Sequence, residues 1–178
     1  MDMNKPIFID FEASAMNGFP VQVAYGTSEA DLKCFLVKPL KIWNDADYMW
    51  DFNAQDIHGF SKAFINTHGV DATEVARIVS EDLRGKTVNA DSNADKFWLG
   101  LLLDDCAEVT GEMYAEPGFM LMQTRYFQDK ISDVEVVYAK RFADAKLKER
   151  NLRPHQADND VLRHIWLWEF LNEKRTYK

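Results

Sequence analysis

Acidic side chains and one histidine occur along the chain in an order that suits metal-dependent chemistry on phosphodiesters. Asp10 and Glu12 end the first apolar run, and Asp95 opens a helical pattern in the middle of the chain. Near the C-terminus, His155 precedes Asp160 by five positions. Carboxylates are costly to cluster unless a cation neutralises them. Oxygen ligands of this type favour Mg²⁺ or Mn²⁺ over Zn²⁺.

The first two carboxylates have strand spacing. Asp10 and Glu12 are two positions apart, so both side chains leave the same face of a strand. The carboxyl end of a central strand is where ligand sites form in α/β sheets, which favours a shared cation site. The alternative is a solvated turn, because Asp-x-Glu is common by chance.

The segment around Asp95 invites a calcium-loop interpretation, which fails. Asp91, Asn93 and Asp95 fit the first three ligand positions of an EF-hand loop. Lys96 stands where that loop needs Gly, and Leu102 stands where it needs a bidentate Glu. Asp95 therefore either enters a metal site from the start of a helix or caps that helix.

The C-terminal histidine precedes a predicted helix. Pro154 suits the entry to a helix, which places His155 at its start. Asp158 and Asp160 lie about 200° apart around such a helix, so only one of them faces a common site. We assign Asp160 to the site and Asp158 to the helix macrodipole. The alternative is a surface histidine followed by acids that favour a helix start.

Hydrophobic periodicity predicts an α/β protein. We expect strands at 6–12, 21–26, 32–37, 87–90 and 119–122, with a hairpin turn at 28–31. We expect helices at about 61–69, 71–85, 95–109, 133–149 and 155–173, and an irregular, aromatic-rich connection at 40–60. This order predicts one domain, residues 1–178, with a mixed central sheet of about five strands flanked by helices.

Composition limits the class of protein. With 178 residues, 47% of them hydrophobic, the chain is long enough for one buried core. No run approaches the roughly 18 apolar residues of a membrane span, and the N-terminus lacks a signal-peptide pattern, so we expect a cytoplasmic protein with no membrane partner. Cys34 and Cys106 lie in apolar stretches without a Cys-x-x-Cys motif, which predicts buried, reduced thiols.

The charge bears on the choice of substrate. A formal net charge of −8 argues against a broad basic surface for long nucleic acid. Bound cations would attract phosphate locally, so a nuclease is not excluded and a short or end-bound substrate is favoured.

Taken together, the motifs resemble the DEDDh family of 3′–5′ exonucleases, which includes ribonuclease T, oligoribonuclease and polymerase proofreading subunits. The family's Asp-x-Glu, helix-start Asp and His-x-x-x-x-Asp correspond to Asp10–Glu12, Asp95 and His155–Asp160. Ile57–Ser61 is similar to an Ile-His-Gly segment between the first two motifs, and Phe8–Ser14 is similar to a small bacterial and phage-like branch.

This resemblance implies a ribonuclease-H-like fold and a site for two divalent cations, Mg²⁺ or Mn²⁺. Asp10 would bridge the cations, Glu12 and Asp160 would hold one, and Asp95 would help to hold the other. His155 would take a proton from the attacking water, a role that histidine suits near neutral pH. The implied product is a nucleoside 5′-monophosphate released from the 3′ end of single-stranded RNA or DNA.

Substrate contacts are expected at Ala13, Ser14, His58 and Phe60, and purely structural roles fit the last three equally well. Two departures concern these contacts: Ala13 stands where many relatives have Thr, and Ala90-Asp91 replaces a frequent His-Asn.

Several alternatives stay open. The chain could be a catalytically inactive nucleic-acid- or partner-binding module on the same fold, or a phosphodiesterase for small nucleotides. The motifs do not separate RNA from DNA. A homodimer is also open, because several members of the family are dimers.

Overall fold

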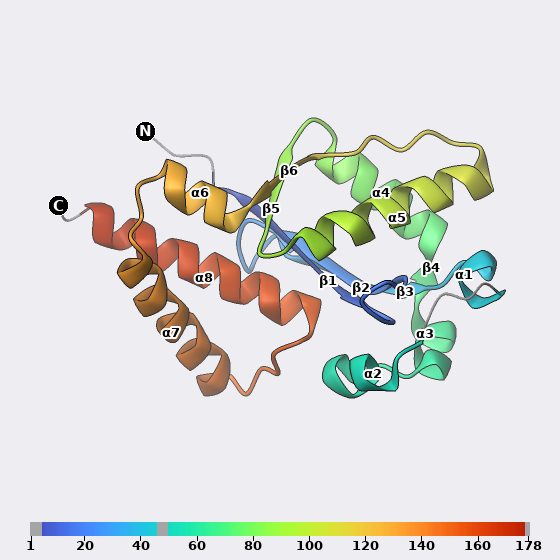
Figure 1. Ribbon diagram of the computed structural model, residues 1–178, viewed down its shortest axis with the longest axis horizontal. Helices are drawn as coiled ribbons and strands as arrows, with labels where there is room; N and C mark the ends of the chain where they lie inside the picture. The colour runs from blue at the N-terminus through green and yellow to red at the C-terminus, as the bar shows by residue number, and fades with distance from the viewer. Residues whose placement is uncertain (1–4, 46–49, 177–178) are drawn as a thin grey trace.

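A computed structural model describes residues 5–45 and 50–176, with a six-stranded sheet between layers of helices (Figure 1). The strands are β1 (Ile7–Ala13), β2 (Pro20–Gly26), β3 (Lys33–Lys38), β4 (Val70–Asp71), β5 (Thr87–Ala90) and β6 (Gly118–Leu121). The helices are α1 (Lys41–Asp45), α2 (Phe52–His58), α3 (Lys62–His68), α4 (Ala72–Leu83), α5 (Asn93–Thr110), α6 (Met122–Gln128), α7 (Asp133–Glu149) and α8 (Ala157–Thr176).

The sheet is mixed, as the sequence predicted. Its strand order is β4-β3-β2-β1-β5-β6, so β1 lies inside the sheet. β2 is antiparallel to both β1 and β3, while β5 is parallel to β1 and β6 is parallel to β5. The predicted hairpin between β2 and β3 and the five predicted strands are confirmed. β4, a sixth strand, is only two residues long and offers no hydrophobic period to detect.

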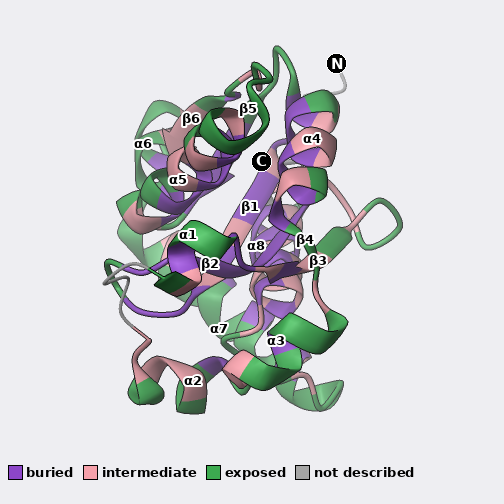
Figure 2. Ribbon diagram, turned by 90° about the vertical axis from the view of Figure 1, so that its right-hand side faces the viewer, coloured by how far each residue is buried: buried purple, intermediate pink, exposed green. Residues whose placement is uncertain are grey.

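Alternation along β1 separates two cores. Ile9, Phe11 and Ala13 belong to the core that includes residues of α4 and α5, while Phe8 belongs to the core formed by α6, α7 and α8. Because side chains alternate across a strand, Asp10 and Glu12 lie on the same face as Phe8, towards α8. Figure 2 shows β1 buried between the helices.

The N-terminus of α8 is attached to the sheet through β2. The Ala157 amide donates a buried hydrogen bond of 2.8 Å to Gln22 Oε1. Helix α8 begins at Ala157 and not at 155, so the prediction that Pro154 stands at the entry of the helix is wrong. His155 lies in the preceding turn with a left-handed backbone (φ 60°), a conformation that a helix cannot continue.

The connection at 40–60 is less irregular than expected. It contains α1 and α2, each too short for a clear period. Asp51 caps α2 by accepting a hydrogen bond from the Asn53 amide, and Gly59 ends the helix in the left-handed conformation (φ 85°). In the sequence, Asp51 and Gly59 were the available signals for the start and the end of α2.

Two further expectations concern single side chains. Ser61 caps α3 as predicted, but Asp71 makes no capping bond to α4 and its Oδ1 lies 3.1 Å from Lys38 Nζ instead. Cys106 is buried as predicted, whereas Cys34 is exposed.

β4 pairs only with the end of β3, at Val37 and Lys38, and leaves the beginning of β3, which includes Cys34, uncovered.

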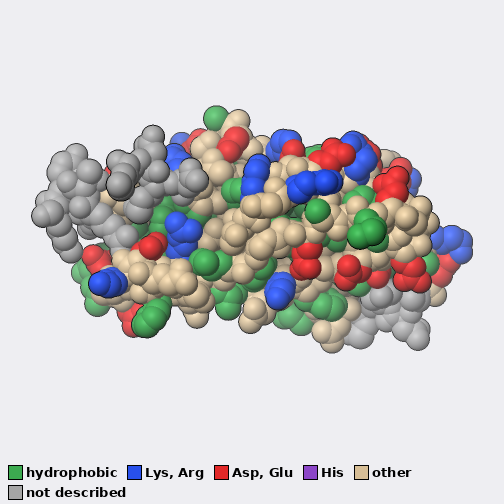
Figure 3. Space-filling model, turned by 90° about the horizontal axis from the view of Figure 1, so that it is seen from above, with side chains coloured by type: hydrophobic (Ala, Val, Ile, Leu, Met, Phe, Trp, Pro, Cys, Tyr) green, Lys and Arg blue, Asp and Glu red, His purple; other side chains and the backbone are tan. Residues whose placement is uncertain are grey.

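The surface and the helices agree with the composition. On the face seen in Figure 3, acidic and basic side chains are interspersed. Within residues 5–45 and 50–176, no helix combines the length and the apolar character that crossing a bilayer requires.

The Gln22 hydrogen bond leads to a stability prediction. Gln22→Leu leaves the Ala157 amide buried without an acceptor, which should lower the free energy of unfolding by about 1–3 kcal/mol. Urea denaturation measures this loss, with the exposed Gln128→Leu as the matched control. Equal stabilities for the two variants would show that Gln22 does not hold α8.

Candidate metal centre

Three of the predicted site residues, from opposite ends of the chain, come together on one side of the sheet. Glu12, His155 and Asp160 each offer a ligand atom, and these atoms all lie within 4.8 Å of one another. Asp160 Oδ2 also accepts a 2.8 Å hydrogen bond from the His155 amide, which holds the turn before α8 against the helix. Because His155 is exposed, its role at this site stays a prediction.

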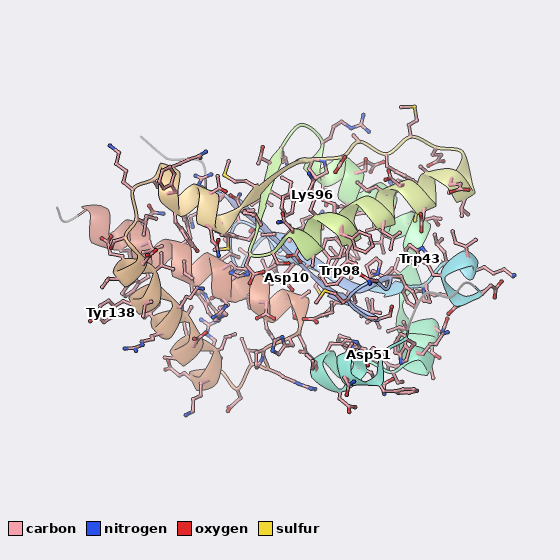
Figure 4. The ribbon with its side chains drawn as sticks, in the orientation of Figure 1. Asp10, Trp43, Asp51, Lys96, Trp98 and Tyr138 are labelled. Atoms are coloured by element: carbon pink, nitrogen blue, oxygen red, sulfur yellow. The ribbon has the colours of Figure 1, made fainter. Side chains whose placement is uncertain are left out.

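A second group surrounds Asp10. Asp10, Asp91 and His164 likewise offer ligand atoms within 4.8 Å of one another. Asp91 follows β5, and His164 lies on α8 one helical turn beyond Asp160. Figure 4 shows Asp10 between α8 and the start of α5. Asp91 and His164 were not among the predicted site residues, although His164 has the i,i+4 spacing from Asp160 that places both on one helix face.

Asp95 occupies a different position from the other carboxylates. It is 3% exposed, and its Oδ1 accepts a 3.1 Å hydrogen bond from the Phe11 amide of β1. Ser92 is the N-cap of α5 and also hydrogen-bonds to Asp95. Asp95 thus fastens the start of α5 to the strand that carries Asp10. Within the described residues it belongs to neither group of three.

Burial and mutual repulsion set the electrostatics of the site. Burial, followed by the charges of Asp95 and Asp160, raises the pKa of Asp10 well above its usual value. Burial and the charges of Asp160 and Asp95 raise the pKa of Glu12 to about 8. Burial also raises the pKa of Asp160. The ionised cluster is therefore unfavourable without added positive charge.

The arginines near the cluster are engaged in other contacts. Arg163 Nε lies 2.6 Å from Asp144 Oδ1, and Arg153 Nη2 donates to the backbone oxygens of Asp56 and Ile57 at 2.8 Å each. The charge of Arg153 only partly offsets the raised pKa of Glu12. A set of carboxylate oxygens that lack sufficient positive charge fits a divalent cation.

The buried histidine of the second group lacks hydrogen bonds. His164 is 2% exposed, and neither ring nitrogen has a hydrogen-bond partner among the described residues. Its Nε2 lies 4.0 Å from Asp91 Oδ2, beyond hydrogen-bonding range. Burial lowers the pKa of His164, so the imidazole is neutral near pH 7.

The predicted substrate-binding residues are mostly buried. Ala13 is 7% exposed, and Ser14 is fully buried with its Oγ accepting a hydrogen bond from the Phe19 amide. His58 is also buried, and its Nδ1 accepts a hydrogen bond from the amide of the partly buried Phe60. Contact of these four residues with a nucleotide stays a prediction.

Arg153 connects this region to the turn before α8, a link that the motifs did not indicate. Its guanidinium reaches the end of α2, and a Cβ added at Gly59 would lie 2.6 Å from Arg153 Nη1. A larger residue at position 59 would displace the Arg153 guanidinium, and the positive φ favours glycine there.

The helix face that carries Asp160 does not carry Asp158. Asp158 lies beside Cys34 of β3, and the Asp158 backbone hydrogen-bonds to the Cys34 thiol. Asp160 is with Glu12 of β1. This separation follows the angle between the two residues around α8.

Comparisons with known proteins identify the fold. No family model and no curated protein sequence matches this chain. Escherichia coli exonuclease I in complex with a dA16 oligonucleotide matches with a TM-score of 0.63 at 14% identity, over 94% of this chain and 40% of that chain. Its zinc-bound complex with single-stranded DNA matches with a TM-score of 0.65 at 14% identity, over 96% and 40%.

Exonuclease X in complex with 5′-overhanging duplex DNA matches with a TM-score of 0.54 at 15% identity, over 95% of this chain and 92% of that chain. The chain thus spans about 40% of the length of exonuclease I and nearly all of exonuclease X. At such low identity the likeness establishes the fold, and the predicted ribonuclease-H-like α/β architecture is confirmed.

The raised carboxyl pKa values predict a pH-dependent stability in EDTA. In the unfolded chain the Asp10 and Glu12 carboxyl groups have ordinary pKa values and release their protons at lower pH than in the folded protein. The free energy of unfolding therefore falls as the pH rises from these ordinary values towards about 8, the pKa of Glu12 in the folded protein. Asp10→Asn removes one of the repelling charges. In EDTA the Tm of this variant should therefore exceed that of the wild type, by a margin that grows between about pH 5 and about pH 8.

Saturating Mg²⁺ should reverse the order, because the wild type alone retains the Asp10 ligand. The exposed Asp104→Asn is the matched control and should follow the wild type throughout. A difference in Tm that does not change with pH would contradict the described repulsion.

Proposed function

We propose that this protein is a metal-dependent 3′–5′ exonuclease that releases nucleoside 5′-monophosphates from single-stranded RNA or DNA. The observation that carries the proposal is the approach of His155 and Asp160 to Glu12, on the same strand face as Asp10. The fold shared with exonucleases I and X supports the proposal at the level of architecture. The two structures of exonuclease I contain a dA16 oligonucleotide and single-stranded DNA, which favours a single-stranded substrate here.

Two divalent cations, Mg²⁺ or Mn²⁺, are the proposed cofactors. Asp10 would be shared between them, with Glu12 and Asp160 on one side and Asp95 supporting the other. When bound, a cation pair would supply the charge that stabilises both the entering and the leaving oxygen of an in-line displacement.

His155 is the proposed proton acceptor. Its side chain is exposed, so water reaches it, and it lies beside the carboxylates of Glu12 and Asp160. The Asp160 carboxylate accepts a hydrogen bond from the His155 amide, and this bond orients the turn that carries the imidazole. His155 would take the proton of the attacking water as the phosphodiester bond breaks.

The proposed nucleotide contacts lie on the side of α2. Ala13 and Ser14 follow the β1 carboxylates, and the ring of Phe60 stacks between those of His58 and Phe64, with centroids 5.5 Å and 6.1 Å away. Phe64 is 44% exposed, so this column of rings offers an apolar surface on which a terminal base could stack. Such stacking tolerates any base, as a nuclease without sequence preference requires.

The activity is tested with single-stranded RNA and DNA oligonucleotides labelled at either end, in Mg²⁺, Mn²⁺ or EDTA. We expect metal-dependent shortening from the 3′ end, with mononucleotide products. His155→Ala should slow it by about 10²–10⁴-fold, because the general base is removed. Gln128→Ala, at an exposed position of α6, is the control and should retain the wild-type rate.

Binding without shortening in any metal would favour the inactive binding module. Cleavage confined to dinucleotides would favour the small-nucleotide phosphodiesterase. Either result would replace the proposed function.

The register of the C-terminal motif gives a separate prediction. Asp160→Asn should lower the rate by roughly 100-fold or more, because a direct ligand is lost. Asp158→Asn should keep the rate within about twofold of wild type, because Asp158 lies at β3 beside Cys34. Steady-state cleavage of one labelled oligonucleotide compares the two. Equal losses would contradict the assignment of Asp160.

A further inference from the structure

We propose that Asp10, Asp91 and His164 form a mixed oxygen–nitrogen site that binds a transition-metal ion, Mn²⁺ or Zn²⁺, in preference to Mg²⁺. This inference deepens the proposed function, because it shares Asp10 and gives the second cation two further ligands. The first observation is the grouping itself, in which the three ligand atoms lie within 4.8 Å of one another.

The spacing of α8 against β1 explains why two ligand groups form side by side. Asp10 and Glu12 are two residues apart on a strand, a rise of about 6.6 Å. Asp160 and His164 are four residues apart on a helix, a rise of about 6 Å. Because these rises match, Glu12 can meet Asp160 while Asp10 meets His164, as the two groups show.

The second observation is the state of His164. The other described histidine that is fully buried, His58, uses its Nδ1 to accept a hydrogen bond from Phe60. Neither ring nitrogen of His164 has such a partner in the described part of the chain, although the residue is 2% exposed. Its Nε2 lies 4.0 Å from Asp91 Oδ2, and a ring nitrogen lies within 4.8 Å of carboxylate oxygens of both Asp91 and Asp10. A buried imidazole without hydrogen bonds calls for a ligand.

Asp91 completes the site and keeps it accessible. Its side chain is 53% exposed, so the site opens to solvent at the end of β5. Its Oδ2 lies 4.0 Å from His164 Nε2. Two ligand atoms that each lie about 2.1 Å from one cation are separated by roughly 3–4 Å, so a small side-chain adjustment suffices.

The ligand chemistry determines the choice of metal. An imidazole nitrogen favours transition-metal ions, whereas Mg²⁺ prefers a shell of oxygens and retains its water. The neighbouring group also contains a histidine, but His155 is exposed and is the proposed proton acceptor. His164 is therefore the nitrogen ligand that distinguishes this site.

Metal binding is measured by isothermal titration calorimetry of the EDTA-stripped protein without nucleic acid, with Mn²⁺, Zn²⁺ and Mg²⁺ in separate titrations. His164→Gln and Asp91→Asn should each weaken the binding of Mn²⁺ and Zn²⁺ at one site by about tenfold or more. His164→Gln should change Mg²⁺ affinity by less than about threefold, because Mg²⁺ does not favour the imidazole nitrogen. His68→Gln and Asp104→Asn, at exposed positions, are the matched controls and should bind as the wild type does.

Thermal melts in EDTA check the fold of each variant. Asp91→Asn changes an exposed side chain and decides the outcome if His164→Gln does not fold. Unchanged Mn²⁺ and Zn²⁺ binding in Asp91→Asn would overturn the site, and a wild-type affinity for Mg²⁺ equal to those for Mn²⁺ and Zn²⁺ would overturn its preference. Because no turnover is measured, the site can stand even if the chain degrades no oligonucleotide.

Discussion

Repulsion between partly buried carboxylates is the constraint on which the rest of the site depends. Asp10 and Glu12 lie on one face of β1, while Ile9 and Phe11 on the opposite face fix the strand in the core. The strand cannot turn these acids towards water without exposing its apolar side chains. Burial and neighbouring charge raise their pKa values, so the site favours protons or cations over the free ionised form.

Two hydrogen bonds between residues distant in sequence bring the helices that carry the remaining ligands to this strand. Gln22 of β2 accepts a hydrogen bond from the first amide of α8, and Asp95 of α5 accepts one from the Phe11 amide of β1. These two contacts attach the starts of both helices to the central strands. As a result, Asp160 approaches Glu12 from α8, and Asp91 approaches Asp10 from the loop before α5. The stability of these attachments and the geometry of the site are therefore coupled.

Local sequence patterns predicted the strand alternation and the mixed sheet, because apolar periodicity reports directly on burial. The spacing of Asp10, Glu12, His155 and Asp160 also indicated the candidate site. His164 and Asp91 were beyond such patterns, since only the packing of α8 and β5 on β1 brings them together. The left-handed turn at His155 and the exposure of Cys34 likewise depend on neighbours distant in sequence.

The most direct test of the account is the position of bound metal. Crystals grown with Mn²⁺ should give anomalous difference peaks at Glu12 and Asp160 and at Asp10, Asp91 and His164, on the side of β1 that faces α8. Ordered crystals with these five side chains in place and no anomalous peak among them would contradict the claim that the carboxylates are gathered to hold cations.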